Sequence, residues 1–136
     1  MSAFVLDPRL QADTHTVAEW PLSRVLLMDD ARYPWAILAP RVPDVSEWFD
    51  LNPQDQNQLS REALSLATQM KALTGARKMN VAALGNMVAQ LHVHVVARFE
   101  GDAAWPGPVW GVGAKILYTD GARQEMLAKL KALSPP

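Results

Sequence analysis

The chain has 136 residues, of which 49% are hydrophobic and 20% are charged, and it contains no cysteine. This length suits one compact core, and the lack of cysteine excludes disulfide bonds and thiolate metal sites. A formal net charge of −1 gives no basic field for a nucleic-acid backbone, and we find neither a leader pattern nor an apolar run long enough to cross a membrane. We therefore expect one domain over residues 1–136, in a cytoplasmic protein with no polynucleotide or membrane partner.

The first regular elements that we predict are two strands joined as a hairpin. The apolar runs at residues 24–28 and 35–39 are β-prone, and the six residues between them suit an antiparallel connection. Asp29 and Asp30 lie in that connection, where aspartate commonly forms turns. Before this hairpin we expect a short strand or extended arm at residues 4–6, a turn at Asp7 and Pro8, and an exposed polar stretch around His15.

A long helix is predicted from about Pro53 to Thr74. Asn52 is a suitable N-cap, Pro53 fits the first helical position, and Gly75 is a suitable stop. Between these ends the apolar residues recur every three to four positions, which makes one stripe for a core. We assign this helix no chemistry. The stripe consists of Leu59, Ala63, Leu66, Ala67, Met70 and Leu73.

A further strand is expected at residues 79–84, followed by a turn at Gly85 and Asn86. Asparagine is mildly unfavourable within a strand, so Asn80 is a candidate either for a ligand contact or for fixing a loop. The amides of the turn are suited to an anion, because successive backbone N–H groups can surround negative charge.

The next strand, at residues 90–95, contains two of the three histidines. Its residues alternate between apolar and hydrogen-bonding side chains, and successive side chains of a strand point to opposite faces. We therefore predict that Gln90, His92 and His94 share one face, with imidazoles roughly 6–7 Å apart. The residues expected to enter the core are Leu91, Val93 and Val95.

The C-terminal third contains a rigid loop and a short helix. Residues 100–111 are rich in proline, glycine and tryptophan, so they exclude a regular helix or central strand. A short helix over about 120–133 is predicted after a cap at Thr119 and Asp120. Its apolar stripe comprises Ala122, Met126, Leu130 and Leu133.

The segment from Gln90 to Val96, Gln-Leu-His-Val-His-Val-Val, resembles the histidine triad (HIT) signature His-x-His-x-His-x-x, with glutamine replacing the first histidine. The resemblance extends over about residues 26–110. It implies an α+β, HIT-like fold with a mainly antiparallel sheet, one long helix and a short C-terminal helix. It also implies a homodimer that binds a small nucleotide without a cofactor.

The family resemblance also implies a reaction at an α-phosphate, in a phosphoramidate or another nucleotide conjugate. His92 holds the central position of the signature, so the resemblance makes it the nucleophile that forms a nucleotidyl-histidine intermediate. His94 would bind the phosphate or protonate the leaving group, and Gln90 would take the place of the first histidine. Hydrolysis and nucleotidyl transfer are both compatible with this chemistry.

Several other residues are assigned to the substrate by the same resemblance. The acceptor for the ribose hydroxyls is expected at Asp29 in preference to Asp30. The turn of Gly85 and Asn86 would approach the phosphate, Asn80 is a candidate substrate contact, and Trp105 is a candidate neighbour of the leaving group.

Two alternatives to catalysis remain. Gln90 cannot titrate, and Met87 stands where commoner branches of the family carry a hydroxyl, so a nucleotide-binding module without turnover is the first. The second is a His-x-His metal site, for which His92 and His94 supply two ligands where at least three are needed. We assign no metal ligands.

Overall fold

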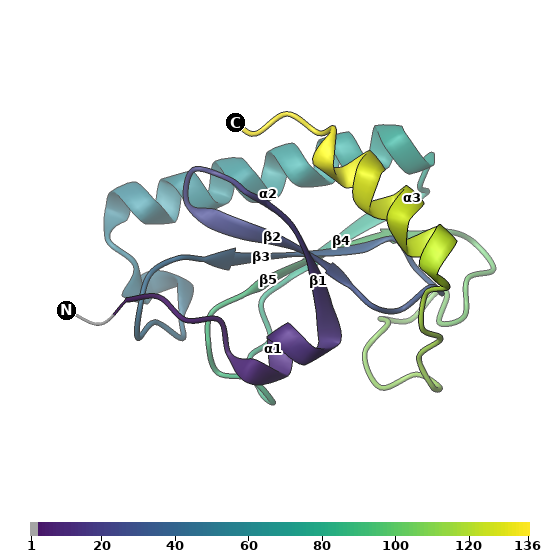
Figure 1. The fold of residues 1–136 in the computed structure, drawn as a ribbon, viewed down its shortest axis with the longest axis horizontal. Helices are drawn as coiled ribbons and strands as arrows, with labels where there is room; N and C mark the ends of the chain where they lie inside the picture. The colour runs from purple at the N-terminus through teal and green to yellow at the C-terminus, as the bar shows by residue number, and fades with distance from the viewer. Residues whose placement is uncertain (1–2) are drawn as a thin grey trace.

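The computed structural model describes residues 3–136, and the first two residues of the predicted domain lie outside this range. A five-stranded antiparallel sheet forms the centre of the molecule (Figure 1). The strand order is β1-β2-β3-β5-β4. The strands are β1 (Thr14–Glu19), β2 (Ser23–Met28), β3 (Trp35–Pro40), β4 (Lys78–Ala82) and β5 (Val93–Arg98).

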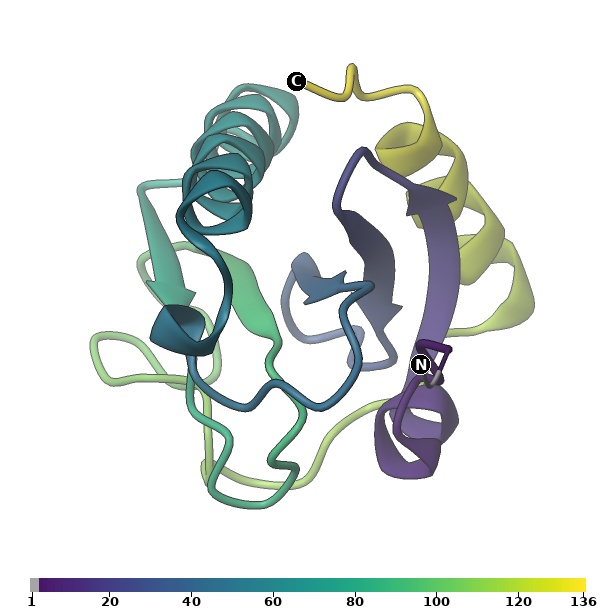
Figure 2. The same cartoon turned by 90° about the vertical axis from the view of Figure 1, so that its left-hand side faces the viewer.

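Two helices flank one side of this sheet, and a short helix with the long loops lies on the other (Figure 2). The first side carries α2 (Pro53–Thr74) and α3 (Asp120–Lys131), and the second carries α1 (Pro8–Asp13). A one-turn 3-10 helix, η1 (Trp48–Asp50), precedes α2. This arrangement confirms the predicted α+β fold with one long helix and a C-terminal helix.

The ends of α2 agree with the local signals in the sequence. The Asn52 side chain accepts a hydrogen bond from the backbone N–H of Asp55, and Gly75 adopts a left-handed conformation with φ of 71°. A residue other than glycine is strained at that φ, so glycine stops the helix at low cost. The buried carboxylate of Glu62 accepts from the backbone N–H groups of Leu22 and Ser23, which fixes α2 to the turn between β1 and β2.

Two apolar clusters divide the core between the faces of the sheet. On β5, Val93 and Val95 belong to the cluster beneath α2 and α3, whereas Val96 belongs to the cluster on the opposite face. His94 therefore lies on the face that α1 and the loops cover, because side chains alternate along a strand.

Three sequence-based boundaries were wrong. The helix α1 (Pro8–Asp13) was not predicted, and β1 (Thr14–Glu19) occupies the stretch around His15 where we expected exposed polar residues, whereas residues 4–6 belong to no helix or strand. β4 ends at Ala82, two residues before the predicted end. The predicted strand at residues 90–95 starts only at Val93 and continues to Arg98.

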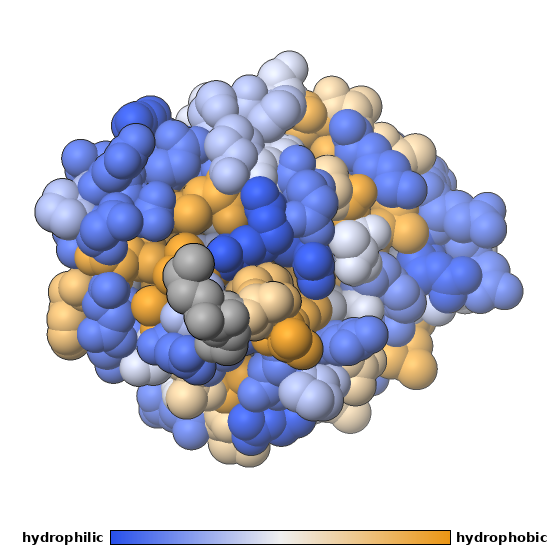
Figure 3. Space-filling view, turned by 60° about the vertical axis from the view of Figure 1, so that its left-hand side comes forward, coloured by the Kyte–Doolittle hydropathy of each residue, from blue (hydrophilic) through white to orange (hydrophobic). Residues whose placement is uncertain are grey.

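The surface is polar over most of its area, with separate apolar patches between the polar ones on the face shown in Figure 3. None of the helices within residues 3–136 has both the length and the apolar character required to cross a bilayer.

Candidate functional site

His92 and His94, here called the histidine pair, lie at the beginning of β5. Both are nearly enclosed, with exposed fractions of 6% and 5%. Their ring centroids are 4.8 Å apart and the rings meet edge to face. The predicted proximity of the two imidazoles is therefore present in the structure, and it is closer than the spacing of a regular strand suggested.

Gln90 does not join the histidine pair through its side chain. Its Oε1 accepts from the backbone N–H of Asp7 at 2.8 Å, and its Nε2 donates to the carbonyl of Val5 at 2.8 Å. The backbone carbonyl of Gln90 instead faces the His92 ring. This contact lies immediately before β5, which begins at Val93.

The contact between Gln90 and His92 fixes the proton of the His92 ring. Nδ1 lies 2.6 Å from the Gln90 carbonyl oxygen. Because a carbonyl only accepts, Nδ1 must carry the hydrogen, and in the neutral ring Nε2 then carries a lone pair. Within residues 3–136 no side chain or backbone group hydrogen-bonds to this Nε2.

The ring of His94 is held in a different way. Its Nδ1 accepts from the indole Nε1–H of Trp35 at 3.0 Å. Burial, and secondarily the neighbouring His92, lowers the pKa of His94 from 6.5 to about 3. His94 is consequently neutral at physiological pH.

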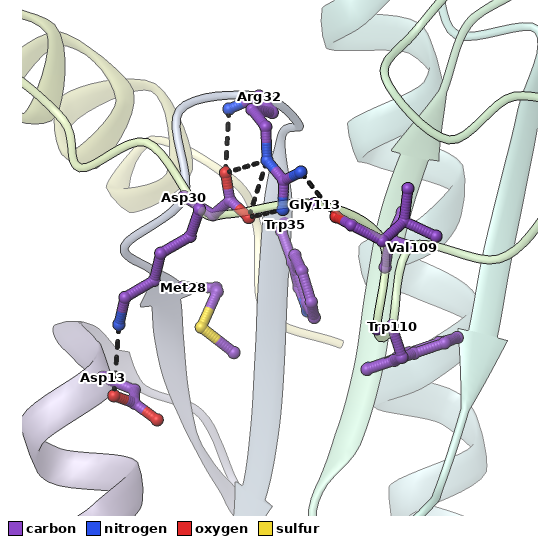
Figure 4. A pocket seen from close by; sticks show the side chains of 11 residues that line it. Asp13, Met28, Asp30, Arg32, Trp35, Val109, Trp110 and Gly113 are labelled. Atoms are coloured by element: carbon purple, nitrogen blue, oxygen red, sulfur yellow. Dashed lines mark hydrogen bonds and ion pairs between the residues drawn. The ribbon is translucent and has the colours of Figure 1, made fainter.

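A pocket of about 310 Å³ is lined by Trp35 and Trp110, the two tryptophans that contact His94, and by neither histidine (Figure 4). Trp35, Met28 and Trp110 form its apolar walls, and Asp30 with Arg32 closes one end. The ring of Trp110 packs against His94 with centroids 5.2 Å apart, so two tryptophans separate this pocket from the histidine ring. The walls suit a flat, uncharged ring such as a nucleobase.

A smaller hollow of about 90 Å³ lies on another side of His92. Gly85 and Gln90 line it together with Trp48 and Phe49. Gly85 has a φ of 80°, which a glycine tolerates well. Asn86 is exposed and is not part of this lining.

Asp29 and Asp30 hold the segment 111–118, here called the closing segment, against the end of β2. Asp29 accepts from the Tyr118 backbone N–H at 2.9 Å and pairs with His15 at 3.2 Å. Asp30 is 2% exposed and binds Arg32 through both carboxylate oxygens. Arg32 in turn donates to the Val112 carbonyl at 2.7 Å. Asp29 and Asp30 are therefore already engaged in hydrogen bonds within the protein.

Asn80 and Trp105 meet at a buried arginine rather than at the histidine pair. Arg98 is 2% exposed and donates to Asn80 Oδ1 at 2.8 Å. It also forms a bidentate ion pair with the Asp102 carboxylate. The Trp105 ring packs on the Arg98 guanidinium, and its centroid lies 5.8 Å from Arg98 Cζ. The hydrogen bonds from Arg98 lower the pKa of Asp102 to about 2, although burial opposes this shift. This network fixes the loop that leads to Trp110.

The structure adds three residues that the sequence analysis did not assign: Trp35, Arg32 and Trp110. The tryptophan-bearing loop was recognised, but Trp110 and not Trp105 contacts the histidine pair. Trp35 stands at the start of a predicted strand, and only the pairing of β3 with β5 brings it to His94. No cluster of three histidine or acidic side chains with metal-binding geometry occurs within residues 3–136.

Comparisons with known proteins agree on one family. The model of the HIT domain matches residues 9–101. A histidine triad protein from Marinobacter aquaeolei VT8 is 48% identical, covering 97% of this chain and 96% of its own, with a TM-score of 0.95. Histidine triad proteins from Bradyrhizobium japonicum and Sinorhizobium meliloti 1021 also have structures similar to this chain. The former is 44% identical, with coverage of 97% and 98% and a TM-score of 0.95.

The Sinorhizobium meliloti protein is also 44% identical, with coverage of 96% of this chain and 97% of its own and a TM-score of 0.94. No curated protein matches the chain. The family model covers well over half of the 136 residues, and the three structures agree with it over nearly the whole chain. The chain belongs to the histidine triad (HIT) family.

Proposed function

We propose that this protein cleaves nucleoside phosphoramidates or related nucleotide conjugates at the α-phosphate, with His92 as nucleophile. The observation that carries this proposal is the fixed His92 ring. Its Nδ1 proton is held by the Gln90 carbonyl at 2.6 Å, so the Nε2 lone pair is left without an internal partner. A neutral imidazole with a free lone pair is a competent nucleophile toward phosphorus.

The proposed reaction has two steps. In the first, a bond forms between His92 Nε2 and phosphorus while the bond from phosphorus to the leaving amine breaks, and the amine takes up a proton. In the second, water attacks phosphorus, the bond to Nε2 breaks, and a nucleoside monophosphate is released with a proton. Another acceptor in place of water would give nucleotidyl transfer.

The two hollows near the histidine pair suggest where each part of the substrate binds. The aromatic pocket between Trp35 and Trp110 suits the base, and the hollow at Gly85 suits the phosphate or the leaving group. The amide of Gln90 is used by the N-terminal segment, so we do not give it a step. Roles in substrate binding for Asp29, Asn80, Asn86 and Trp105 stay predictions.

A nucleotide-binding module without turnover is the second candidate. It is favoured by one observation: the closing segment already bonds to Asp29, the carboxylate expected to receive the ribose, and to the neighbouring Asp30. The same chain would then bind a nucleoside monophosphate without cleaving its conjugates.

One experiment distinguishes the two candidates. The purified protein is incubated with an adenosine phosphoramidate, and the released amine is measured alongside the binding of adenosine monophosphate. We expect release that falls by at least about 10³-fold in His92→Ala. His15→Asn is the matched control, because His15 is the one histidine outside the pair.

Rapid quenching followed by mass spectrometry of the intact protein tests the intermediate. The proposal predicts a nucleotidyl adduct on a peptide containing His92. Binding of the monophosphate with no release of amine and no adduct would reject catalysis and support the binding module.

We also propose a homodimer. Exposed apolar side chains lie on the outer strand β4 and the loop after it, at Val81, Leu84 and Met87. An exposed group of this kind is often covered by a second subunit. Light scattering from the purified protein should give twice the mass of the chain, and a monomer at micromolar concentration would refute this proposal.

A further inference from the structure

Trp35 is the first residue of β3 and reaches across to His94 on β5. Its exposed fraction is 6%, and its indole Nε1 lies 3.0 Å from His94 Nδ1. The indole is confined by Tyr33 on one side and by Trp110 on another, with ring centroids 6.2 and 6.0 Å away. Aromatic packing of this density leaves the indole little freedom to turn its N–H elsewhere.

The contact determines where the His94 proton resides. An indole nitrogen is only a donor, so His94 Nδ1 must be the unprotonated nitrogen and the ring proton must be on Nε2. If both ring nitrogens of His94 were protonated, its Nδ1–H would point at the indole N–H of Trp35 across only 3.0 Å, and the two donors would repel each other. His92 and His94 are therefore fixed as opposite tautomers, one by a carbonyl and the other by an indole.

We propose that Trp35 is a positioning residue that holds His94 as a neutral ring with its proton on Nε2, so that His94 offers an N–H to the substrate phosphate beside the lone pair of His92. This role rests on the function proposed above. It assigns His94 the stabilisation of negative charge on a non-bridging oxygen. It also excludes His94 as the source of the proton that the leaving amine needs, because the neutral ring keeps its single proton.

The chemistry balances with water as the proton carrier. Solvent supplies the proton that the amine takes up when the bond from His92 Nε2 to phosphorus forms. The attacking water returns one proton to solvent in the second step. His94 donates the same hydrogen bond throughout and ends each cycle unchanged.

The electrostatics around His94 agree with this assignment. Burial lowers its pKa to about 3, and within the described chain the neighbouring titratable group that adds to this lowering is His92. The elements packed on the ring contribute the uncharged side chains of Trp35 and Trp110. No carboxylate is present there to stabilise an imidazolium.

The test is a measurement of the ring nitrogens by NMR. In protein labelled with ¹⁵N-histidine, two-bond correlations between carbon-bound protons and ring nitrogens distinguish protonated from unprotonated positions. We expect His94 to show an unprotonated Nδ1 and a protonated Nε2 at neutral pH. In Trp35→Phe, which keeps an aromatic ring but removes the N–H, we expect a mixture of the two tautomers.

Trp110→Phe is the matched control for the tautomer. Trp110 packs on the same ring, but its own indole nitrogen is buried without a partner, so its removal should leave the His94 tautomer unchanged. In the turnover assay, Trp35→Phe should lower kcat about tenfold with little change in KM, as expected for one hydrogen bond misdirected in the transition state.

The outcomes separate this inference from the proposed function. A proton on Nδ1 of His94 in the unmodified protein, or an unchanged tautomer in a folded Trp35→Phe protein, would overturn the inference even if phosphoramidates are cleaved. The expected tautomers without any cleavage would leave the positioning by Trp35 supported and would reject the enzymatic function. The measurement on the unmodified protein does not depend on the folding of any variant.

Discussion

The histidine pair and Asp29, the first of two aspartates after β2, were expected to face the substrate, yet the structure uses the histidines and the aspartates in opposite ways. Each imidazole uses its Nδ1 for a contact within the protein, and among residues 3–136 no group hydrogen-bonds to its Nε2. The carboxylates of Asp29 and Asp30 instead bind Tyr118, Ile116, Arg32 and His15.

The difference shows what the residue type alone does not reveal. Aspartate and histidine both suit ligand binding, but only unpaired atoms are available for it, and the pairing depends on neighbours distant in sequence. The contacts within the protein orient the two imidazole rings, whereas the two aspartates attach the closing segment to the sheet. The predictions that follow test this division.

The largest expected effect is a pH dependence of stability that comes from His94. The pKa is 6.5 for an ordinary exposed histidine, which represents His94 in the unfolded chain, and about 3 for His94 in the folded protein. Below pH 6.5 the unfolded chain binds a proton that the folded chain does not bind, so the stability falls as the pH falls toward 3. We expect a total loss on the order of 4 kcal/mol over this window.

Urea unfolding between pH 7 and pH 4.5 measures this loss, and His94→Asn should flatten the curve. Asp29 and Asp30 change the stability in a lower pH range than His94. Hydrogen bonds from their partners outweigh the effect of burial and lower the pKa of each carboxyl below 3.8. The stability that they provide is present above pH 3.8 and is lost only below it. An equal slope in His94→Asn and the unmodified protein would contradict the assignment.

The next effect is expected from Asp30→Ala. This change leaves the Arg32 guanidinium, whose side chain is 13% exposed, without its carboxylate and releases the amide of Ile116. We expect a loss of about 3 kcal/mol in the free energy of unfolding, because one partner of a nearly buried pair is removed. Hydrogen exchange should accelerate at residues 112–118.

Asp120→Ala is the control for this loss, since Asp120 forms an exposed pair with Arg123. Its effect should stay within about 1 kcal/mol. Similar losses in the two variants would show that the closing segment is not fixed by Asp30.

A smaller effect is expected from Gln90→Ala. The change removes two hydrogen bonds to the N-terminal segment, at Asp7 and Val5, and should cost about 1–2 kcal/mol of stability. Because the backbone carbonyl of residue 90 still orients His92, turnover should fall by less than about tenfold. A loss as large as that of His92→Ala would instead support a direct catalytic role for the amide.

The smallest effect is expected from Asp29→Asn. The new side chain can still accept from the Tyr118 N–H, and the pair with His15 is partly exposed, with side-chain fractions of 31% and 20%. We expect a change below about 1 kcal/mol. Calorimetry with adenosine monophosphate should show less than about a threefold change in affinity, and a much larger loss would return Asp29 to the role of ribose acceptor.

Local signals in the sequence were sufficient for the long helix and the hairpin. Asn52, Pro53 and Gly75 act within one turn of the chain, so the ends of α2 could be predicted to the residue. Asp7 and Pro8 carry the same capping signal, but the six-residue α1 has too short an apolar stripe to be recognised. β1 is polar in sequence and becomes a strand by pairing with β2.

The candidate site was predicted only in its local part. His92 and His94 lie two residues apart, so their proximity followed from the sequence. Trp35, Arg32 and the closing segment reach their partners through tertiary contacts that no local pattern encodes. The single-domain prediction for residues 1–136 stays a prediction.

The bonds of Gln90 to Val5 and Asp7 carry a consequence for how the protein matures. These partners are 85 and 83 positions apart in the sequence, and Trp35 is 59 positions from His94. Closing such long loops is slow compared with forming a helix or a hairpin. The bonds of Gln90 to the N-terminal segment and of Trp35 to His94 can therefore form only after residues 90 and 94 have left the ribosome, so both contacts arise late in the folding of the chain.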